Sequence, residues 1–219
     1  IYCQGMSIAD LTGIEAFTAL TYLNCEDNQL TSLDISNNLA LNSINCSNNQ
    51  LTSIDVSAAT ALINLQCYDN QLTSLNINQN TALIYLYCSY NQIISLDISQ
   101  NPSLISLNCS YNQLVSLDVR NGNNIIIDTL QHSIFRTKNN PTLSCINVDD
   151  AAWSTATWTN IDPQHYFSNN CNTTAIQEHT TNKELLKVTD LLGRKTKQTN
   201  QPLFYIYDDG TVEKRIVIE

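Results

Sequence analysis

The chain of 219 residues carries 20 acidic and 10 basic side chains, giving a net charge of -10, and 42% of its residues are hydrophobic. This hydrophobic content is sufficient for a packed core, and no apolar run reaches the roughly 18 residues that a bilayer-spanning helix needs. Residues 1–175 hold 3 basic and 13 acidic side chains, whereas 176–219 hold 7 of each. An acidic body argues against nucleic acid or an anionic membrane surface as the main partner, because both bind basic faces. The chain starts at Ile1 without a signal peptide, so we expect a mature or truncated product.

One phrase, LNCEDNQLTSLDIS at residues 23–36, recurs with small changes in five copies that are 21 residues apart. A fixed period in this range is typical of a solenoid, in which each coil buries its apolar edge against its neighbours. The pattern L-x-x-L-x-C-x-x-N-x-L resembles the leucine-rich repeat. That resemblance implies parallel β-strands on a concave face and short second strands or turns on the convex face. We expect such a solenoid over residues 1–124, with a truncated first coil and five repeats at 20–124.

A cysteine occupies the third apolar slot of each repeat. Parallel side chains on strands about 4.8 Å apart put Cβ atoms beyond the usual 3.5–4.5 Å of a disulfide. Metal ligation needs ligands that converge from several directions, which one straight file does not provide. The sequence therefore predicts buried, free thiols that pack as small hydrophobes, rather than a disulfide ladder or a metal site. The ladder cysteines are Cys3, Cys25, Cys46, Cys67, Cys88 and Cys109.

Two polar columns share the 21-residue step. Asparagine side chains both donate and accept hydrogen bonds, which suits the corner of every coil. The corner asparagines are Asn28, Asn49, Asn70, Asn91 and Asn112. The second column lies on the convex side and consists of Asp34, Asp55, Asn76, Asp97 and Asp118. These residues are either solvated turn residues or ligands of a calcium ion. We favour solvated turns, because no Gly-Asp calcium-loop pattern accompanies the column.

Tyrosines gather on the outward side of the predicted first strands. If Leu23 and Cys25 point inward, positions 22, 24 and 26 point outward, with 27 at the rim. Tyrosine beside asparagine and serine provides rigid aromatic area with adaptable hydrogen bonding, as on recognition surfaces. The plainer alternative is that tyrosine is favoured on any exposed strand. The predicted binding residues are Tyr22, Asn24, Tyr68, Tyr85, Tyr87, Tyr90, Asn108 and Tyr111.

The period breaks after Leu117, and we expect irregular terminal coils and a cap over 125–171. Aligning NPTL (140–143) with NPSL (101–104) puts Ile146 and Val148 inward and Cys145 outward. Trp153, Trp158, Tyr166 and Phe167 are available to cover the open end of the core. Two cysteines outside the ladder bracket this segment, which predicts a Cys145–Cys171 disulfide and an oxidising compartment; two unrelated thiols are the alternative.

Residues 172–182 are polar and aperiodic, as expected of a linker. Two apolar strands then flank Asp209-Gly210, a hairpin signal within a small β module. The strings LLKVTDLLGRK and PLFYIYDDGTVEKRIVIE resemble the end of the C-terminal sorting domain of the bacterial type IX (Por) secretion system, although an earlier Pro-Asn-Pro strand of the longer form is absent. The resemblance covers 183–219 and implies partnership with that export machinery, removal of the tail, and release or anchoring at the cell surface.

The repeats also resemble internalin-type proteins, which implies adhesion or protein recognition, although internalin repeats usually have 22 residues and lack the cysteine column.

No catalytic motif occurs, and the sequence indicates no enzyme, no metal and no cofactor. His132, His165 and His179 lack a cysteine or carboxylate at ligand spacing. We therefore expect a secreted or surface-displayed module that binds a protein or a glycan through its Tyr/Asn face. The alternatives are a rigid spacer in a longer surface protein and a non-catalytic fragment of a larger secreted enzyme.

Overall fold

The computed structural model describes residues 1–123 and 134–171, together with three strands at 185–189, 202–207 and 212–216. The chain divides into two compact units, Ile1–Thr173 and Thr174–Glu219. Within the described residues, no helix is long and apolar enough to cross a membrane.

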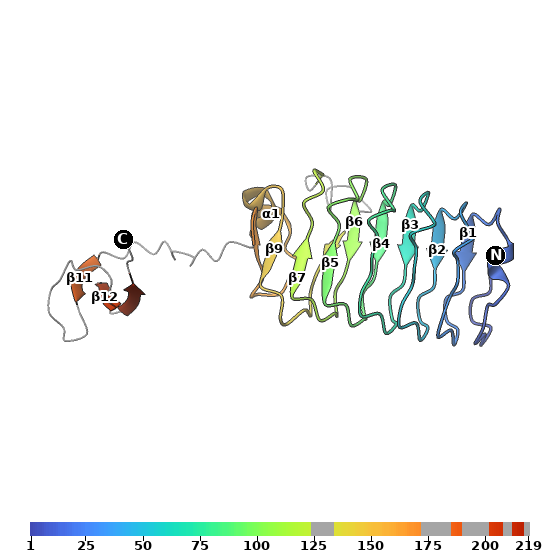
Figure 1. Cartoon of the computed structure of the whole chain (residues 1–219), viewed down its shortest axis with the longest axis horizontal. Helices are drawn as coiled ribbons and strands as arrows, with labels where there is room; N and C mark the ends of the chain where they lie inside the picture. Colours follow the sequence, from blue (N-terminus) through green and yellow to red (C-terminus); the bar gives the residue numbers. More distant parts are fainter. Residues whose placement is uncertain (124–133, 172–184, 190–201, 208–211, 217–219) are drawn as a thin grey trace. The chain divides into compact units, whose positions relative to one another are not determined.

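The first unit is a solenoid in which two parallel sheets run along the coils (Figure 1). The first sheet has the order β1 (Tyr22–Asn24), β2 (Ser43–Asn45), β3 (Asn64–Gln66), β4 (Tyr85–Tyr87), β6 (Ser106–Asn108) and β8 (Phe135–Arg136). The second sheet has the order β5 (Ser95–Asp97), β7 (Ser116–Asp118), β9 (Cys145–Asn147) and β10 (Tyr166–Ser168). Two short helices accompany the sheets, the 3-10 helix η1 (Ile14–Ala16) and the helix α1 (Ala151–Thr157).

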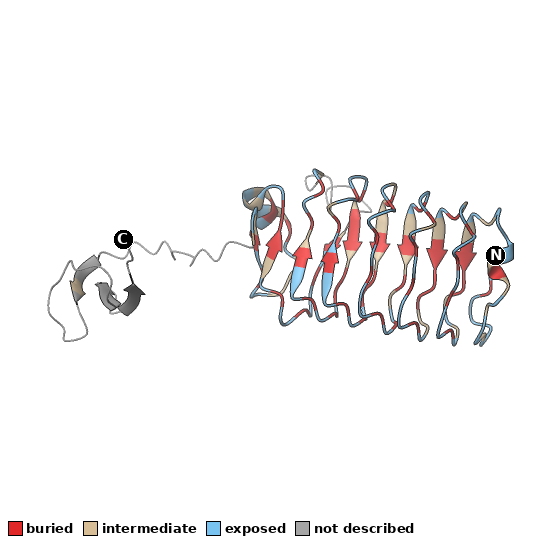
Figure 2. Ribbon diagram, viewed as in Figure 1, coloured by how far each residue is buried: buried red, intermediate tan, exposed pale blue. Residues whose placement is uncertain are grey.

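The 21-residue step becomes direct pairing between strands. Leu23 pairs with Ile44, Ile44 with Leu65, and each repeat continues in the same register as far as Leu107. These leucines and isoleucines are fully buried, so the middle residue of each first-sheet strand faces the core (Figure 2). Burial of one such side chain per coil stabilises the stack by roughly 1.5–3 kcal/mol each.

The corner asparagines hold the coils together. The Nδ2 group of Asn91 donates to the carbonyl oxygens of Cys67 (3.0 Å) and Cys88 (3.2 Å), and its Oδ1 accepts from the backbone N–H of Leu72 at 2.9 Å. One side chain thus satisfies buried backbone groups on two successive coils, which no apolar residue could do. The same pattern occurs at Asn28, Asn49, Asn70, Asn112 and Asn140.

A second asparagine column, absent from the sequence interpretation, lies on the other side of each coil. Asn80 donates to the carbonyl oxygens of Val56 (2.9 Å) and Ala59 (2.8 Å), and its side chain is fully buried. Asn38, Asn101 and Asn121 take equivalent positions. The 21-residue step relates Asn38, Asn80 and Asn101, but Ala59 interrupts the column and Asn121 follows Asn101 by only 20 residues.

The last coils correct the predicted alignment of NPTL with NPSL. Phe135, 28 residues after Leu107, takes the next place in the first sheet, and Thr137 follows in the buried slot that cysteine fills elsewhere. Ile146 instead pairs with Leu117 in the second sheet. Ile146 and Val148 are buried as expected, but they face the core from the other sheet. The alignment was wrong because the step from Leu107 to Phe135 is 28 residues instead of 21, which shifts NPTL to the corner that holds Asn112 in the preceding coil.

Aromatic residues close the C-terminal end of the core. Trp158 stacks on Phe135 with ring centroids 3.8 Å apart and meets Phe167 edge-on at 5.6 Å. Helix α1 begins at a side-chain cap, since a carboxylate oxygen of Asp150 accepts from the N–H of Trp153 at 3.0 Å. Tyr166 is 40% exposed, so its predicted part in covering the core is wrong; in β10 it alternates outward beside Phe167.

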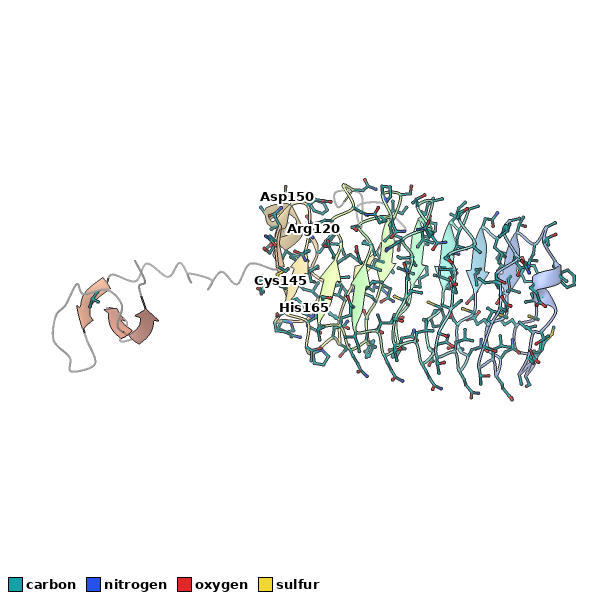
Figure 3. All side chains as sticks on the ribbon, in the orientation of Figure 1. Arg120, Cys145, Asp150 and His165 are labelled. Atoms are coloured by element: carbon teal, nitrogen blue, oxygen red, sulfur yellow. A yellow bond between two sulfur atoms is a disulfide. The ribbon has the colours of Figure 1, made fainter. Side chains whose placement is uncertain are left out.

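The predicted disulfide is confirmed. Cys145 in β9 is bonded to Cys171, three residues beyond the end of β10, with a sulfur–sulfur distance of 2.06 Å. The bond joins the last two strands of the second sheet at the end of the solenoid, where Figure 3 also shows Asp150 and His165. It lies outside the core, as the outward position of Cys145 requires.

The second unit contains an antiparallel sheet of β11 (Leu185–Thr189), β12 (Pro202–Tyr207) and β13 (Val212–Ile216), with β12 in the centre. This agrees with a small β module. The predicted linker at 172–182 and the turn at Asp209-Gly210 lie outside the described residues.

Candidate recognition face

The outward side of the first sheet, with the rim residues that follow each strand, forms a surface that we call the β1–β8 face. Strand pairing places equivalent residues of successive coils in straight columns. The first position of each strand gives Tyr22, Ser43, Asn64, Tyr85 and Ser106. The third position gives Asn24, Asn45, Gln66, Tyr87, Asn108 and Arg136. The face is therefore a polar, tyrosine-rich strip.

The tyrosines differ in how far they are exposed. Tyr22, Tyr68, Tyr85 and Tyr87 are half-buried, because neighbouring coils crowd the middle of the face. Tyr90 and Tyr111 at the rim are 51% and 45% exposed.

The two asparagines predicted to bind are less accessible. Asn24 is buried, and its Oδ1 accepts the N–H of Glu26 at 3.0 Å. Asn108 is half-buried and bonds the N–H of Ser110 in the same way, at 3.2 Å. These amides fix the turn that follows the strand, so Asn24 contributes little surface for a ligand.

Glu26 organises the N-terminal half of the face. Its carboxylate accepts hydrogen bonds from the Tyr68 hydroxyl and from Nδ2 of Asn45. Burial and the hydrogen bond to Glu26 together raise the pKa of Tyr68 to about 12. Three coils are thus joined by one carboxylate, which holds the Tyr68 ring in a single orientation.

The rim residues adopt a left-handed backbone that bulky side chains rarely take. Asp27, Asn48, Asp69, Tyr90, Tyr111 and Asn139 have φ between 53° and 60°. Asparagine and aspartate tolerate this conformation, whereas a tyrosine there is unusual. Tyr90 and Tyr111 nevertheless occupy it on adjacent coils, and their rings stack with centroids 4.2 Å apart and planes within 9°. Residues placed against backbone preference are concentrated at functional sites.

The register shift in the final coil brings two basic residues to the face that the sequence interpretation missed. Arg136 occupies the column of Asn108, and Lys138 follows two residues later, beside Tyr111. The residues at the opposite end of the face are acidic, with Glu26 and Asp27 in the β1 coil. Only a 28-residue step would have aligned Arg136, and nothing in the 21-residue pattern indicates such a step.

The ladder cysteines lie beneath the face, in the core. All six are free and buried. Burial raises the pKa of Cys25 and Cys88 to about 12, and those of Cys46, Cys67 and Cys109 are also raised by burial. These thiols stay protonated at neutral pH, and a protonated thiol is neither a nucleophile nor a metal ligand.

The carboxylates of the convex column accept backbone hydrogen bonds that stabilise turns. Oδ1 of Asp34 accepts the N–H of Ser36 at 2.9 Å, and this bond lowers the pKa of the carboxyl group. The same turn recurs at Asp55, Asn76, Asp97 and Asp118. Within the described residues, no group of three or more His, Cys, Asp or Glu side chains is placed to hold a metal ion.

His165 is a buried structural residue of the cap. Its Nε2 lies 3.5 Å from Oδ2 of Asp162, a carboxylate that also accepts the N–H groups of Asn139 and Asn140 at 2.9 Å each. The pair ties the cap to the last corner of the first sheet. His132 and His179 lie outside the described residues.

Comparison with known proteins places these features among leucine-rich repeats. No protein-family model matches the chain. Internalin J of Listeria monocytogenes is 56% identical over 36 residues, which are 16% of this chain and 4% of that protein. A similar structure is described as the functional domain of InlJ from Listeria monocytogenes, which includes a cysteine ladder. It is 31% identical to this chain, and the match covers 68% of this chain and 43% of the InlJ chain, with a TM-score of 0.40.

The leucine-rich repeat domain of APL1B is 20% identical over 76% of this chain and 55% of its own, with a TM-score of 0.54. This likeness shows the fold. The protein is a leucine-rich repeat solenoid with an internal cysteine ladder, and it spans about half or less of the length of each of these relatives.

Proposed function

We propose that the protein is a secreted or surface-displayed bacterial recognition module, whose β1–β8 face binds a protein or a glycan. The observation that carries the proposal is the placement of the tyrosines, because all seven tyrosines before residue 112 lie on this face or its rim. Exposed aromatic side chains that gather on one surface of a rigid scaffold usually mark a site of contact.

Two further observations support binding. The Tyr68 ring is fixed by Glu26, and Tyr90 is fixed by stacking on Tyr111, so these residues lose little conformational freedom when a ligand arrives. The identity of 56% with internalin J over 36 residues also supports a surface role. We infer that the ladder thiols serve the fold and take no part in chemistry at the face, because they are buried and protonated.

The direct test is a screen of the 219-residue chain against a glycan array and a panel of purified surface proteins. We expect at least one saturable interaction, and we expect it to weaken when Tyr85 and Tyr87 are both replaced by alanine. Tyr166→Ala serves as the matched control, because Tyr166 is an exposed tyrosine on the second sheet. A folded chain that binds no member of either panel would contradict the proposal.

The second candidate function is that of a rigid spacer. The unbroken file of corner asparagines from Asn28 to Asn140 favours it, because these side chains brace every corner of the solenoid whether or not the face binds anything. A spacer would show no saturable ligand, and its function would tolerate replacement of the face tyrosines.

We propose in addition that 183–219 directs export through the type IX secretion machinery. The antiparallel sheet of β11, β12 and β13 is compatible with a small folded sorting signal, and the sequence resemblance supplies the specific assignment. The disulfide of Cys145 and Cys171 agrees with an extracytoplasmic destination. Deleting 183–219 in a host that has this system should leave the protein in the periplasm. Unchanged export of the deletion variant would refute the assignment.

A further inference from the structure

We propose that the C-terminal end of the β1–β8 face binds an acidic sugar, meaning a pyranose ring that bears a carboxylate, in a hollow between the tyrosine pair and the last coil. The inference rests on the proposed binding function of this face and specifies one part of it. The hollow has a volume of about 280 Å³ and is lined by Tyr90, Tyr111, Asn108, Arg136, Lys138 and Asn139, with serine and a further asparagine completing its wall.

Charge favours an anionic ligand. Arg120, Arg136 and Lys138 are the three basic residues of 1–173, and two of them line this one hollow in an otherwise acidic body. Arg120 forms an ion pair with Asp118, whereas neither Arg136 nor Lys138 forms an ion pair within the described part of the chain. The nearby carboxylate of Asp162 already accepts two backbone N–H groups and lies next to His165. Within the described residues, two exposed cations without a carboxylate partner therefore line the hollow, and a guanidinium group binds a carboxylate in a bidentate manner.

The remaining wall favours a sugar over an acidic peptide. Tyr90 and Tyr111 stack on each other and both line the hollow, so the pair offers aromatic surface against which a pyranose ring can pack. Asparagine and serine side chains supply donors and acceptors for hydroxyl groups. Among the described residues, no aliphatic side chain lines the hollow, although apolar contacts usually anchor a peptide.

The backbone supplies an independent reason to regard the tyrosine pair as functional. Positions equivalent to Tyr90 and Tyr111 hold Asn48 and Asn139 on other coils, where asparagine suits the positive φ. The fold therefore does not need tyrosine at the rim. Among these rim positions, tyrosine occupies the two that line the hollow together with Arg136 and Lys138.

The test is isothermal titration calorimetry of the 219-residue chain with four probes: 3′-sialyllactose, tetragalacturonic acid, neutral lactose and a penta-glutamate peptide. We expect at least one of the two acidic sugars to bind, and lactose and the peptide not to bind. The two acidic probes distinguish a sialic acid from a uronic acid as the source of the carboxylate.

Three variants locate the site. Arg136→Gln with Lys138→Gln should weaken binding of the acidic sugar by about tenfold or more. Tyr111→Asn should also weaken it while keeping the fold, since Asn48 and Asn139 hold the equivalent position on other coils. Arg120→Gln removes one positive charge just beyond β7 of the second sheet and should leave the affinity within about twofold.

Failure of both acidic sugars to bind, equal binding of lactose, binding of the peptide alone, or an equal loss in Arg120→Gln would each overturn the proposal. If these sugars fail while another ligand still depends on Tyr85 and Tyr87, the sugar site is refuted and the recognition function stands.

Discussion

The hydroxyl of Tyr68 donates a hydrogen bond to Oε1 of Glu26, a residue 42 positions earlier in the chain and two coils away. The other carboxylate oxygen of Glu26 accepts from Asn45 on the intervening coil at 2.9 Å. Two residues 42 positions apart in sequence meet here because the 21-residue register stacks equivalent positions of successive coils. It makes the face a set of fixed side chains rather than a row of independent ones.

Replacing Glu26 with glutamine should lower the pKa of Tyr68 from about 12 toward its ordinary value near 10, because the hydrogen bond to the carboxylate and its negative charge both oppose ionisation of the phenol. Because the chain has ten tyrosines, the difference between the phenolate absorbance titrations of the unaltered chain and a Tyr68→Phe chain, each with and without Glu26→Gln, isolates this pKa. Glu15→Gln removes an acidic side chain that does not contact Tyr68 and should leave the titration unchanged. A Tyr68 pKa that is the same in both variants would show that the contact does not form in solution.

Replacing Asn91 with alanine should destabilise the solenoid by about 2–4 kcal/mol, because the buried N–H of Leu72 and carbonyl oxygens on two coils lose their partner. Urea unfolding followed by circular dichroism measures the change. Asn78→Ala is the control, since the Asn78 side chain is exposed, and its effect should stay within about 0.5 kcal/mol. Equal effects of the two changes would show that the corner hydrogen bonds do not stabilise the fold.

The cysteine ladder should make stability fall in alkaline solution. The folded pKa of Cys88 is about 12, well above the value near 9 expected in the unfolded chain, so the folded state holds a proton that the unfolded state loses. The contribution is complete below about pH 9 and is lost as pH rises toward 12, with a slope of up to about 1.4 kcal/mol per pH unit for each buried thiol.

Cys88→Ala should therefore reduce the slope of unfolding free energy against pH by about one proton between pH 9 and 12, as measured by denaturant titrations at several pH values. Ile93→Val is the matched control, because it removes a buried methyl group without removing a thiol. An unchanged slope in Cys88→Ala would mean that this cysteine is accessible to solvent in the folded protein.

The sequence was sufficient to predict the coils that keep a strict period. Leu23, Ile44 and Leu65 occupy the same phase of the repeat, and equal phase translates directly into strand pairing in the first sheet. The pairing of Cys145 with Cys171 was also predictable, because the other cysteines belong to the ladder. The local residue pattern and the fixed 21-residue step are enough to predict these pairings without knowledge of tertiary contacts.

The final coil was not predictable in the same way. Its extra length places Phe135 in the first sheet and Ile146 in the second, and the 21-residue pattern indicates neither position. The repeat pattern also did not predict how far each side chain on the β1–β8 face is exposed to solvent. Asn24 alternates outward along its strand but is buried by its neighbours and by its own turn hydrogen bond.

A comparison of dissociation constants for the best ligand from the screen tests the proposed role of the β1–β8 face as the binding surface. The Tyr85→Ala, Tyr87→Ala double variant should bind at least about tenfold more weakly than the unaltered chain, as expected when central aromatic contacts are removed. Tyr166→Ala, on the second sheet, should bind with unchanged affinity. Equal affinity of all three proteins, each shown to be folded, would contradict the account and place the binding surface elsewhere.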